Sequence, residues 1–171
     1  ETQKIWHEYG KGAPSHKPPF DGTSHISGQN LFVSAYHGFY TLGNEHTPEP
    51  QPFVPFPVDA LEFVCCERPN SQDLLLRFRL TFEDCPEPER YHILMKIQLT
   101  SPAKGKKPGL MRNFLALEPC RAGDSTVEFL VKDYRGIWDL DLQEYKAHCK
   151  YVLLDRQTGY RNIETPLSFI F

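Results

Sequence analysis

Histidine and cysteine are the residues of this chain best suited to nucleophilic or metal chemistry, and their spacing argues against both. The 171 residues include five cysteines, and none of these stands in a C-x-x-C pair, so the zinc signal is weak. His148 precedes Cys149, but neighbours on a strand point to opposite faces and would not form a catalytic pair. No G-x-S-x-G or G-x-x-x-x-G-K-[ST] motif occurs. We therefore predict no catalytic residue, no metal site, no cofactor and no enzymatic activity.

Three lysines gather in the Gly- and Pro-rich segment 101–109, at Lys104, Lys106 and Lys107. Ammonium groups grouped in this way attract phosphorylated lipid headgroups or acidic peptides. The chain as a whole carries a net charge of -3 and has a pI of about 6.2, which makes nucleic acid an improbable partner. An anionic membrane surface is therefore one candidate partner, and a solvated loop is the alternative interpretation.

A second cluster combines aromatic and aliphatic side chains with an arginine, at Tyr134, Arg135, Ile137 and Trp138. Exposed aromatic residues beside arginine are typical of protein contact patches. The alternative for Trp138 is an ordinary place in the core. A sheet with a free edge would also accept a peptide as an added strand. These features favour a protein or peptide partner.

The elements that position these residues are predicted to be strands. From Ala60 onward, apolar and polar residues alternate with a period of two, most clearly over 73–82 and 91–100, which we expect to pair with each other. Further strands are expected over 125–132, 145–153 and 166–171. About seven strands at spacings of ten to twenty residues predict an all-β fold, a two-sheet antiparallel β-sandwich over 60–171.

Residues 1–59 differ from the rest of the chain and are predicted to form an irregular, extended arm that packs on the sandwich. Segment 47–57 holds five of the 15 prolines and is expected to be extended, with Phe53 and Phe56 held on a core. The aromatic run 31–42 is expected to form one or two short strands, a hairpin within the arm. The high proline content makes long helices unexpected, and no apolar run is long enough to span a membrane.

The run from Trp138 to Tyr151 resembles the penultimate strand of immunoglobulin-like and fibronectin type III-like sandwiches. In those domains a Leu precedes a Tyr, which is followed by alternating small apolar residues, as Leu142, Tyr145 and Ala147 do here. The sequence departs from a true immunoglobulin domain because Tyr145 lies four residues before Cys149 rather than two, and because 91–100 contains no Trp. The resemblance is architectural and implies a sandwich of two sheets.

The run from Val127 to Asp141 resembles the late strand and loop of the calcium- and lipid-binding sandwiches of protein kinase C-type proteins. The resemblance implies that Asp133, Asp139 and Asp141 lie at one end of the sandwich, where such domains hold calcium. No second loop with paired aspartates appears near Asp84, although calcium needs six to eight oxygens. A complete calcium site is therefore not expected.

The leading hypothesis from the sequence is a non-enzymatic module that binds a protein or peptide. The alternatives are a peripheral sandwich that binds anionic lipid and an enzyme on a β-scaffold. The chain ends within an apolar run, Leu167–Phe171, which favours a fragment of a larger protein. None of the five asparagines lies in an Asn-x-Ser/Thr acceptor, and this favours an intracellular over a secreted location.

Overall fold

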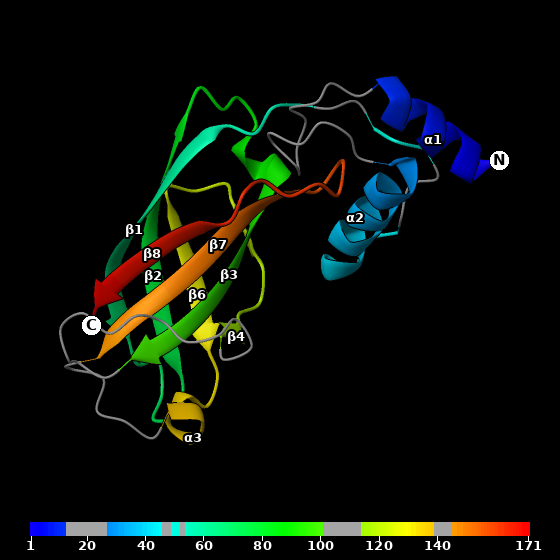
Figure 1. Cartoon of the computed structure of the whole chain (residues 1–171). Coiled ribbons are helices and arrows are strands. Elements are labelled where there is room, and N and C mark those ends of the chain that lie inside the picture. The colour runs from blue at the N-terminus through cyan, green and yellow to red at the C-terminus, as the bar shows by residue number, and fades with distance from the viewer. Residues whose placement is uncertain (13–26, 46–48, 52–53, 101–113, 139–144) are drawn as a thin grey trace.

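Two antiparallel sheets packed face to face form the body of the protein, and two helices lie at one end of it (Figure 1). The computed structural model describes residues 1–12, 27–45, 49–51, 54–100, 114–138 and 145–171. No helix in these ranges is long and apolar enough to cross a membrane. All five cysteines fall within them, and each is a free thiol.

The predicted two-sheet antiparallel arrangement is confirmed. Sheet A has three strands in the order β1 (Val58–Glu67), β2 (Leu74–Glu83) and β6 (Thr126–Val131). Sheet B has the order β4 (Leu115–Ala116), β3 (Tyr91–Thr100), β7 (Lys146–Asp155) and β8 (Thr165–Ile170), and β5 (Cys120–Arg121) also pairs with β3. Every pairing between these strands is antiparallel.

The core lies between the sheets and uses the apolar rows that the alternation predicts. Leu76 and Phe78 from β2, and Ile93 and Ile97 from β3, are fully buried. The ring of Phe78 packs edge-on against Phe129 with centroids 5.9 Å apart. The outward-facing residues of the same strands are therefore the ones available to a partner.

The expected pairing of β2 with β3 is wrong. β2 pairs with β1 and β6 in sheet A, whereas β3 lies in sheet B beside β7. Between them the chain passes through Asp84, whose φ is 49°, and the 3-10 helix η1 (Pro88–Arg90), which take it from one sheet to the other. The alternation of apolar and polar residues shows which side chains face the core. It does not show whether two strands are neighbours in one sheet or lie in opposite sheets, because the same side chains are buried in both arrangements.

The prediction of an irregular N-terminal arm with a hairpin over 31–42 is also wrong, so the fold is mostly β rather than all-β. Residues Thr2–Gly12 form α1, and Gly28–Thr41 form α2. The Ser27 side chain accepts a hydrogen bond from the backbone N–H of Asn30 and caps α2. The buried residues of α2 recur at helical spacing: Gly28, Leu31, Ala35, Gly38 and Phe39.

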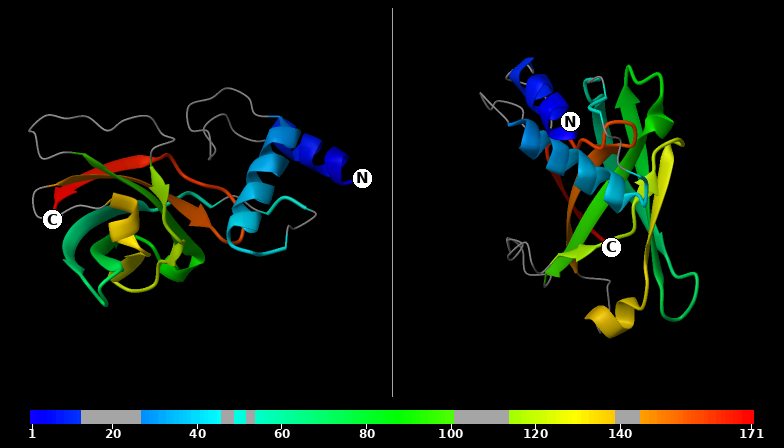
Figure 2. Two further views of the ribbon diagram at one scale, coloured as in Figure 1. Left: turned by 90° about the horizontal axis from the view of Figure 1, so that it is seen from below. Right: turned by 90° about the vertical axis from the view of Figure 1, so that its right-hand side faces the viewer.

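Helices α1 and α2 lie beside each other at one end of the sandwich (Figure 2), and a small second core attaches them to it. Trp6 from α1 and Phe39 from α2 are buried with Tyr160, which lies between β7 and β8. Phe56 packs against both cores, as the sequence predicts for this residue, while Phe53 lies outside the described residues. Gly38 lets α2 approach the β7–β8 connection closely, because a Cβ atom there would lie 1.9 Å from the Gly159 carbonyl oxygen.

The edge strands of the two sheets meet on one side of the sandwich. The ring of Phe63 in β1 stacks on Phe169 in β8 with centroids 3.8 Å apart. The register of β1 shifts between Phe63 and Cys65, and β8 carries Pro166. A bulge and a proline both make an edge a poorer acceptor for an added strand.

Candidate functional site

The outward-facing side of sheet B is rich in positive charge. Alternate residues of β3 and β7 face outward, and they bring Lys96, Lys146 and Lys150 to this side. We call the following six residues the basic face: Lys96, Arg121, Lys146, Lys150, Arg156 and Arg161. The single acidic side chain placed among them by a described contact is Glu164, which pairs with Lys150 at 3.3 Å.

Sheet A differs because its outward-facing arginines have carboxylate partners. Arg77 lies 2.6 Å from Glu67 and 2.8 Å from Glu128, and Arg79 lies 3.9 Å from Glu62. Residues 61–171 contain sixteen basic and sixteen acidic residues, so this part of the chain has no net charge. Among the described residues, the outward-facing arginines of sheet A are paired with carboxylates, whereas Lys150 is the one residue of the basic face with a described ion pair.

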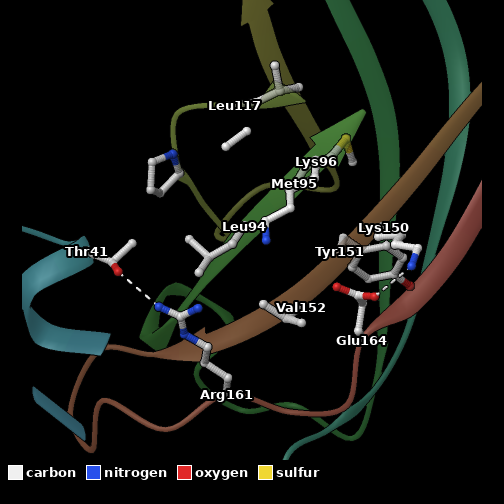
Figure 3. Close-up of a pocket in the computed structure, with 12 residues that line it drawn as sticks. Thr41, Leu94, Met95, Lys96, Leu117, Lys150, Tyr151, Val152, Arg161 and Glu164 are labelled. Atoms are coloured by element: carbon white, nitrogen blue, oxygen red, sulfur yellow. Dashed lines mark hydrogen bonds and ion pairs between the residues drawn. The ribbon is translucent and has the colours of Figure 1, made fainter. Parts of the chain in front are cut away.

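A groove of about 220 Å³ lies within the basic face, between β3, β7 and the end of α2 (Figure 3). Leu94, Leu117 and Val152 supply its apolar surface. Charged side chains surround this surface and come from β3, β7 and the β7–β8 connection: Lys96, Lys150, Arg161 and Glu164. Such a surface suits a segment that carries both apolar and acidic side chains.

Arg161 is the most distinctive residue of the groove. Its Nη2 donates a hydrogen bond of 3.0 Å to the hydroxyl of Thr41, the last residue of α2. Within the described part of the chain no carboxylate pairs with its guanidinium, and burial lowers its pKa below the ordinary value. Arginine remains charged at neutral pH even so. A half-buried cation with spare donors is suited to bind an incoming carboxylate.

The aromatic patch predicted at Tyr134–Trp138 is only partly exposed. These residues form the short helix α3 (Tyr134–Trp138). Tyr134 is 1% exposed and belongs to the main core, which corrects its predicted exposure. Arg135 and Ile137 are exposed, and the side chain of Trp138 lies outside the described residues. The structure thus places two of these four side chains on the surface.

The other predicted site residues lie mostly outside the described residues. These include the lysines Lys104, Lys106 and Lys107 and the aspartates Asp139 and Asp141. Asp133 is described: its φ is 50°, and its carboxylate accepts a hydrogen bond from the backbone N–H of Gly136. Asp133 thus caps the turn that leads into α3. Among the described residues, no group of three His, Cys, Asp or Glu side chains is arranged to hold a metal.

His148 is the described histidine with the most enclosed side chain, on the outward side of β7. Its Nε2 lies 3.0 Å from the Thr100 hydroxyl, and its Nδ1 lies 3.2 Å from the Ser168 hydroxyl. Burial, and to a smaller extent the charge of Lys146, lower the pKa of this imidazole. The imidazole of His148 in β7 thus links the hydroxyl of Thr100 in β3 to that of Ser168 in β8. No described carboxylate is hydrogen-bonded to the ring, as one would be in a catalytic triad.

We expect acid to weaken the fold through His148. Because its folded pKa lies below the unfolded value of about 6.5, the unfolded chain binds the proton more readily. The stabilisation is therefore present above pH 6.5 and is lost as the pH falls through the folded pKa. Urea unfolding at pH 7 and pH 5 should show a smaller loss in His148→Gln than in the unaltered protein. Equal losses in both proteins would contradict this assignment.

Comparison with protein-family models and with curated proteins finds no match for this chain. The site therefore has to be interpreted from its own geometry.

The basic face was not predicted, although the sequence contains a signal for it. Lys146, His148 and Lys150 alternate along one predicted strand, and Lys96 lies on the outward-facing row of another. The pairing of β3 with β7, in which Lys96 lies opposite Lys150, brings these cations together. Arg161 carries no such signal, because the β7–β8 connection and α2 position it.

Proposed function

We propose that this protein is a non-enzymatic interaction module that binds an acidic segment of another protein on the basic face of sheet B. The observation that carries the proposal is the half-buried guanidinium of Arg161 at an apolar groove, hydrogen-bonded to Thr41 and without a carboxylate partner among the described residues. Leu94 and Val152 offer contacts to apolar side chains of the segment, and Arg161 and Lys96 offer contacts to its carboxylates.

The outer face supports this mode of binding better than the edges formed by β1 and β8 do. Strand addition needs a regular free edge, but β1 has a register shift and β8 begins with Thr165-Pro166.

The test is fluorescence anisotropy with a labelled peptide of alternating Glu and Leu residues, titrated with the protein at low and moderate salt. We expect binding that weakens as salt rises. Arg161→Gln should weaken it about tenfold, because a hydrogen bond to a charged group contributes roughly 1.5–3 kcal/mol. No binding at low salt, or unchanged binding by Arg161→Gln, would refute the proposal.

A matched pair of variants separates a local site from a general charge effect. Lys96→Glu and Arg79→Glu each lower the net charge by the same amount, and both side chains are exposed on a mid-strand position. Lys96 lines the groove, whereas Arg79 lies on sheet A beside Glu62. Lys96→Glu should weaken peptide binding about tenfold and Arg79→Glu less than about twofold. Equal effects would show that no specific site exists.

Anionic lipid is the rival partner, since the basic segment that contains Lys104, Lys106 and Lys107 follows β3 in the chain. Co-sedimentation with phosphatidylserine vesicles, with and without alanine at these three lysines, tests it. Vesicle binding that depends on the three lysines, in a protein that does not bind the acidic peptide, would replace a protein partner with a membrane.

A further inference from the structure

A second, separate hollow lies beyond the groove, where β3 begins and β7 ends. Its volume is about 460 Å³, and its six lining residues are Leu42, Asn44, His92, Arg121, Arg156 and Gln157. Three of the six carry a cationic or imidazole group, and none is acidic. The hollow shares no lining residue with the groove that contains Arg161.

Strand register brings the three nitrogen-bearing side chains together. His92 in β3 lies directly opposite Arg121 in β5, so their side chains share a face. His92 also lies opposite Leu154 in β7, and Arg156 follows two residues later. The backbone N–H of Arg156 donates to the Arg90 carbonyl, which holds this turn against the start of β3.

Both arginines have donors to spare. The Nε of Arg121 donates to the Glu89 backbone carbonyl at 3.2 Å, which orients its guanidinium without neutralising it. Neither Arg121 nor Arg156 forms an ion pair with another described residue. Two like charges held around one hollow repel each other, and an anion placed between them relieves that repulsion.

His92 adds a third donor. Its Nδ1 is buried and has no hydrogen-bond partner in the described structure. A neutral imidazole carries one proton, which can lie on either ring nitrogen. If the proton is on Nε2, the buried Nδ1 is an unpaired acceptor, which costs no more than an unpaired donor at the same place. Because Nδ1 is buried, Nε2 is the ring nitrogen through which His92 can donate to a ligand in the hollow.

We propose that the hollow formed by His92, Arg121 and Arg156 binds a phosphomonoester group, either free or at the end of a larger molecule. Two guanidinium groups and one imidazole, from three segments of the chain, offer more donors than a carboxylate can use, which suits the three terminal oxygens of a phosphomonoester dianion. Arg121 and Arg156 belong to the basic face, but neither lines the groove that contains Arg161, so this inference does not depend on binding of a segment in that groove.

The charged groups around the imidazole make the binding measurable. Burial lowers the pKa of His92, and the charges of Arg121 from β5 and Arg156 after β7 lower it further. The remaining lining residues, from the end of α2 and from the turn after β7, are uncharged. A bound dianion would offset the two arginines, so the pKa of His92 should rise when phosphate binds.

The experiment is an NMR titration of the His92 imidazole signals with inorganic phosphate at constant ionic strength, with chloride as the reference anion. We expect saturable shifts with phosphate, and an upward move of the His92 titration curve at saturating phosphate. Arg121→Gln and Arg156→Gln should each weaken phosphate binding at least about fivefold. Arg161→Gln, in the groove, should leave it unchanged.

Three results would overturn the proposal: no saturation, equal response to chloride, or equal weakening by Arg161→Gln. The last would place the anion in the groove. Parallel titrations with O-phosphoserine and with vesicles that contain a phosphorylated inositol lipid identify the source of the phosphoryl group. Preference for either one over inorganic phosphate would support the site and name its carrier.

Discussion

Replacing Arg90 with alanine is expected to lower the free energy of unfolding by about 3–5 kcal/mol, because the substitution leaves a buried carboxylate without its counter-charge. Arg90 donates to Asp155 through Nε at 2.9 Å and through Nη2 at 2.7 Å. The Asp155 side chain is 2% exposed, and the hydrogen bond from Arg90 is the main cause that raises the arginine pKa. Urea unfolding at pH 7 measures the loss.

The matched control is Arg79→Ala, which breaks an exposed ion pair. Arg79 and Glu62 lie 3.9 Å apart with side chains 64% and 69% exposed. Exposed pairs contribute about 0–1 kcal/mol, so the control should lose little stability. Losses of similar size in both variants would show that burial does not set the strength of the Arg90–Asp155 pair.

Replacing Trp6 with alanine is expected to lower the free energy of unfolding by about 3–5 kcal/mol, as is typical when a large aromatic residue is removed from a core. Trp6 is 1% exposed and packs edge-on against Phe32 with ring centroids 5.5 Å apart. It also lies against α2 so closely that a Cβ on Gly28 would be 2.2 Å from the Trp6 carbonyl oxygen. Urea unfolding followed by circular dichroism tests the expected loss.

Tyr40→Ala is the control for the helix pair, since the Tyr40 side chain is on α2 and is 73% exposed. We expect its effect to stay within about 0.5 kcal/mol. Trp138→Phe leaves Trp6 as the only tryptophan, so its fluorescence then reports on the helix pair separately. Equal stability of Trp6→Ala and Tyr40→Ala would contradict the second core described for Trp6, Phe39 and Tyr160.

The inward rows of the strands could be predicted from the sequence, because burial of one sheet face enforces a period of two. Leu76, Phe78 and Ile93 lie where that period places them. Which strand lies beside β2 could not be predicted. It depends on whether the chain turns back after Glu83 to pair with β2 or crosses to the opposite sheet. The bend at Asp84 and the 3-10 helix at Pro88 decide it.

Helix α2 was predictable in principle and was misassigned. Leu31, Ala35 and Phe39 are spaced for one helix face, and Ser27 is a good N-cap residue. The aromatic content of 31–42 favoured strands because Phe and Tyr are common there. A proline-rich composition does not exclude a helix of 14 residues when the prolines lie outside it.

The candidate site could be predicted least, because it is assembled from segments far apart in the chain. Arg161 meets Thr41 across 120 positions of sequence, and His92 meets Arg121 only through strand register. Each of these residues alone is an ordinary polar side chain in the sequence. Their juxtaposition becomes visible only with the order of strands in sheet B.

The described outward-facing arginines of sheet A have carboxylate partners, whereas Lys150 is the one residue of the basic face with a described ion pair, so we expect an excess of positive charge on the outer side of sheet B. An approaching anionic molecule would therefore experience a torque that turns sheet B toward it before contact, although the protein carries a net charge of -3. Encounter rates should then depend on ionic strength in the manner of oppositely charged partners. A description of this protein as a uniformly acidic particle would predict the wrong sign of that dependence.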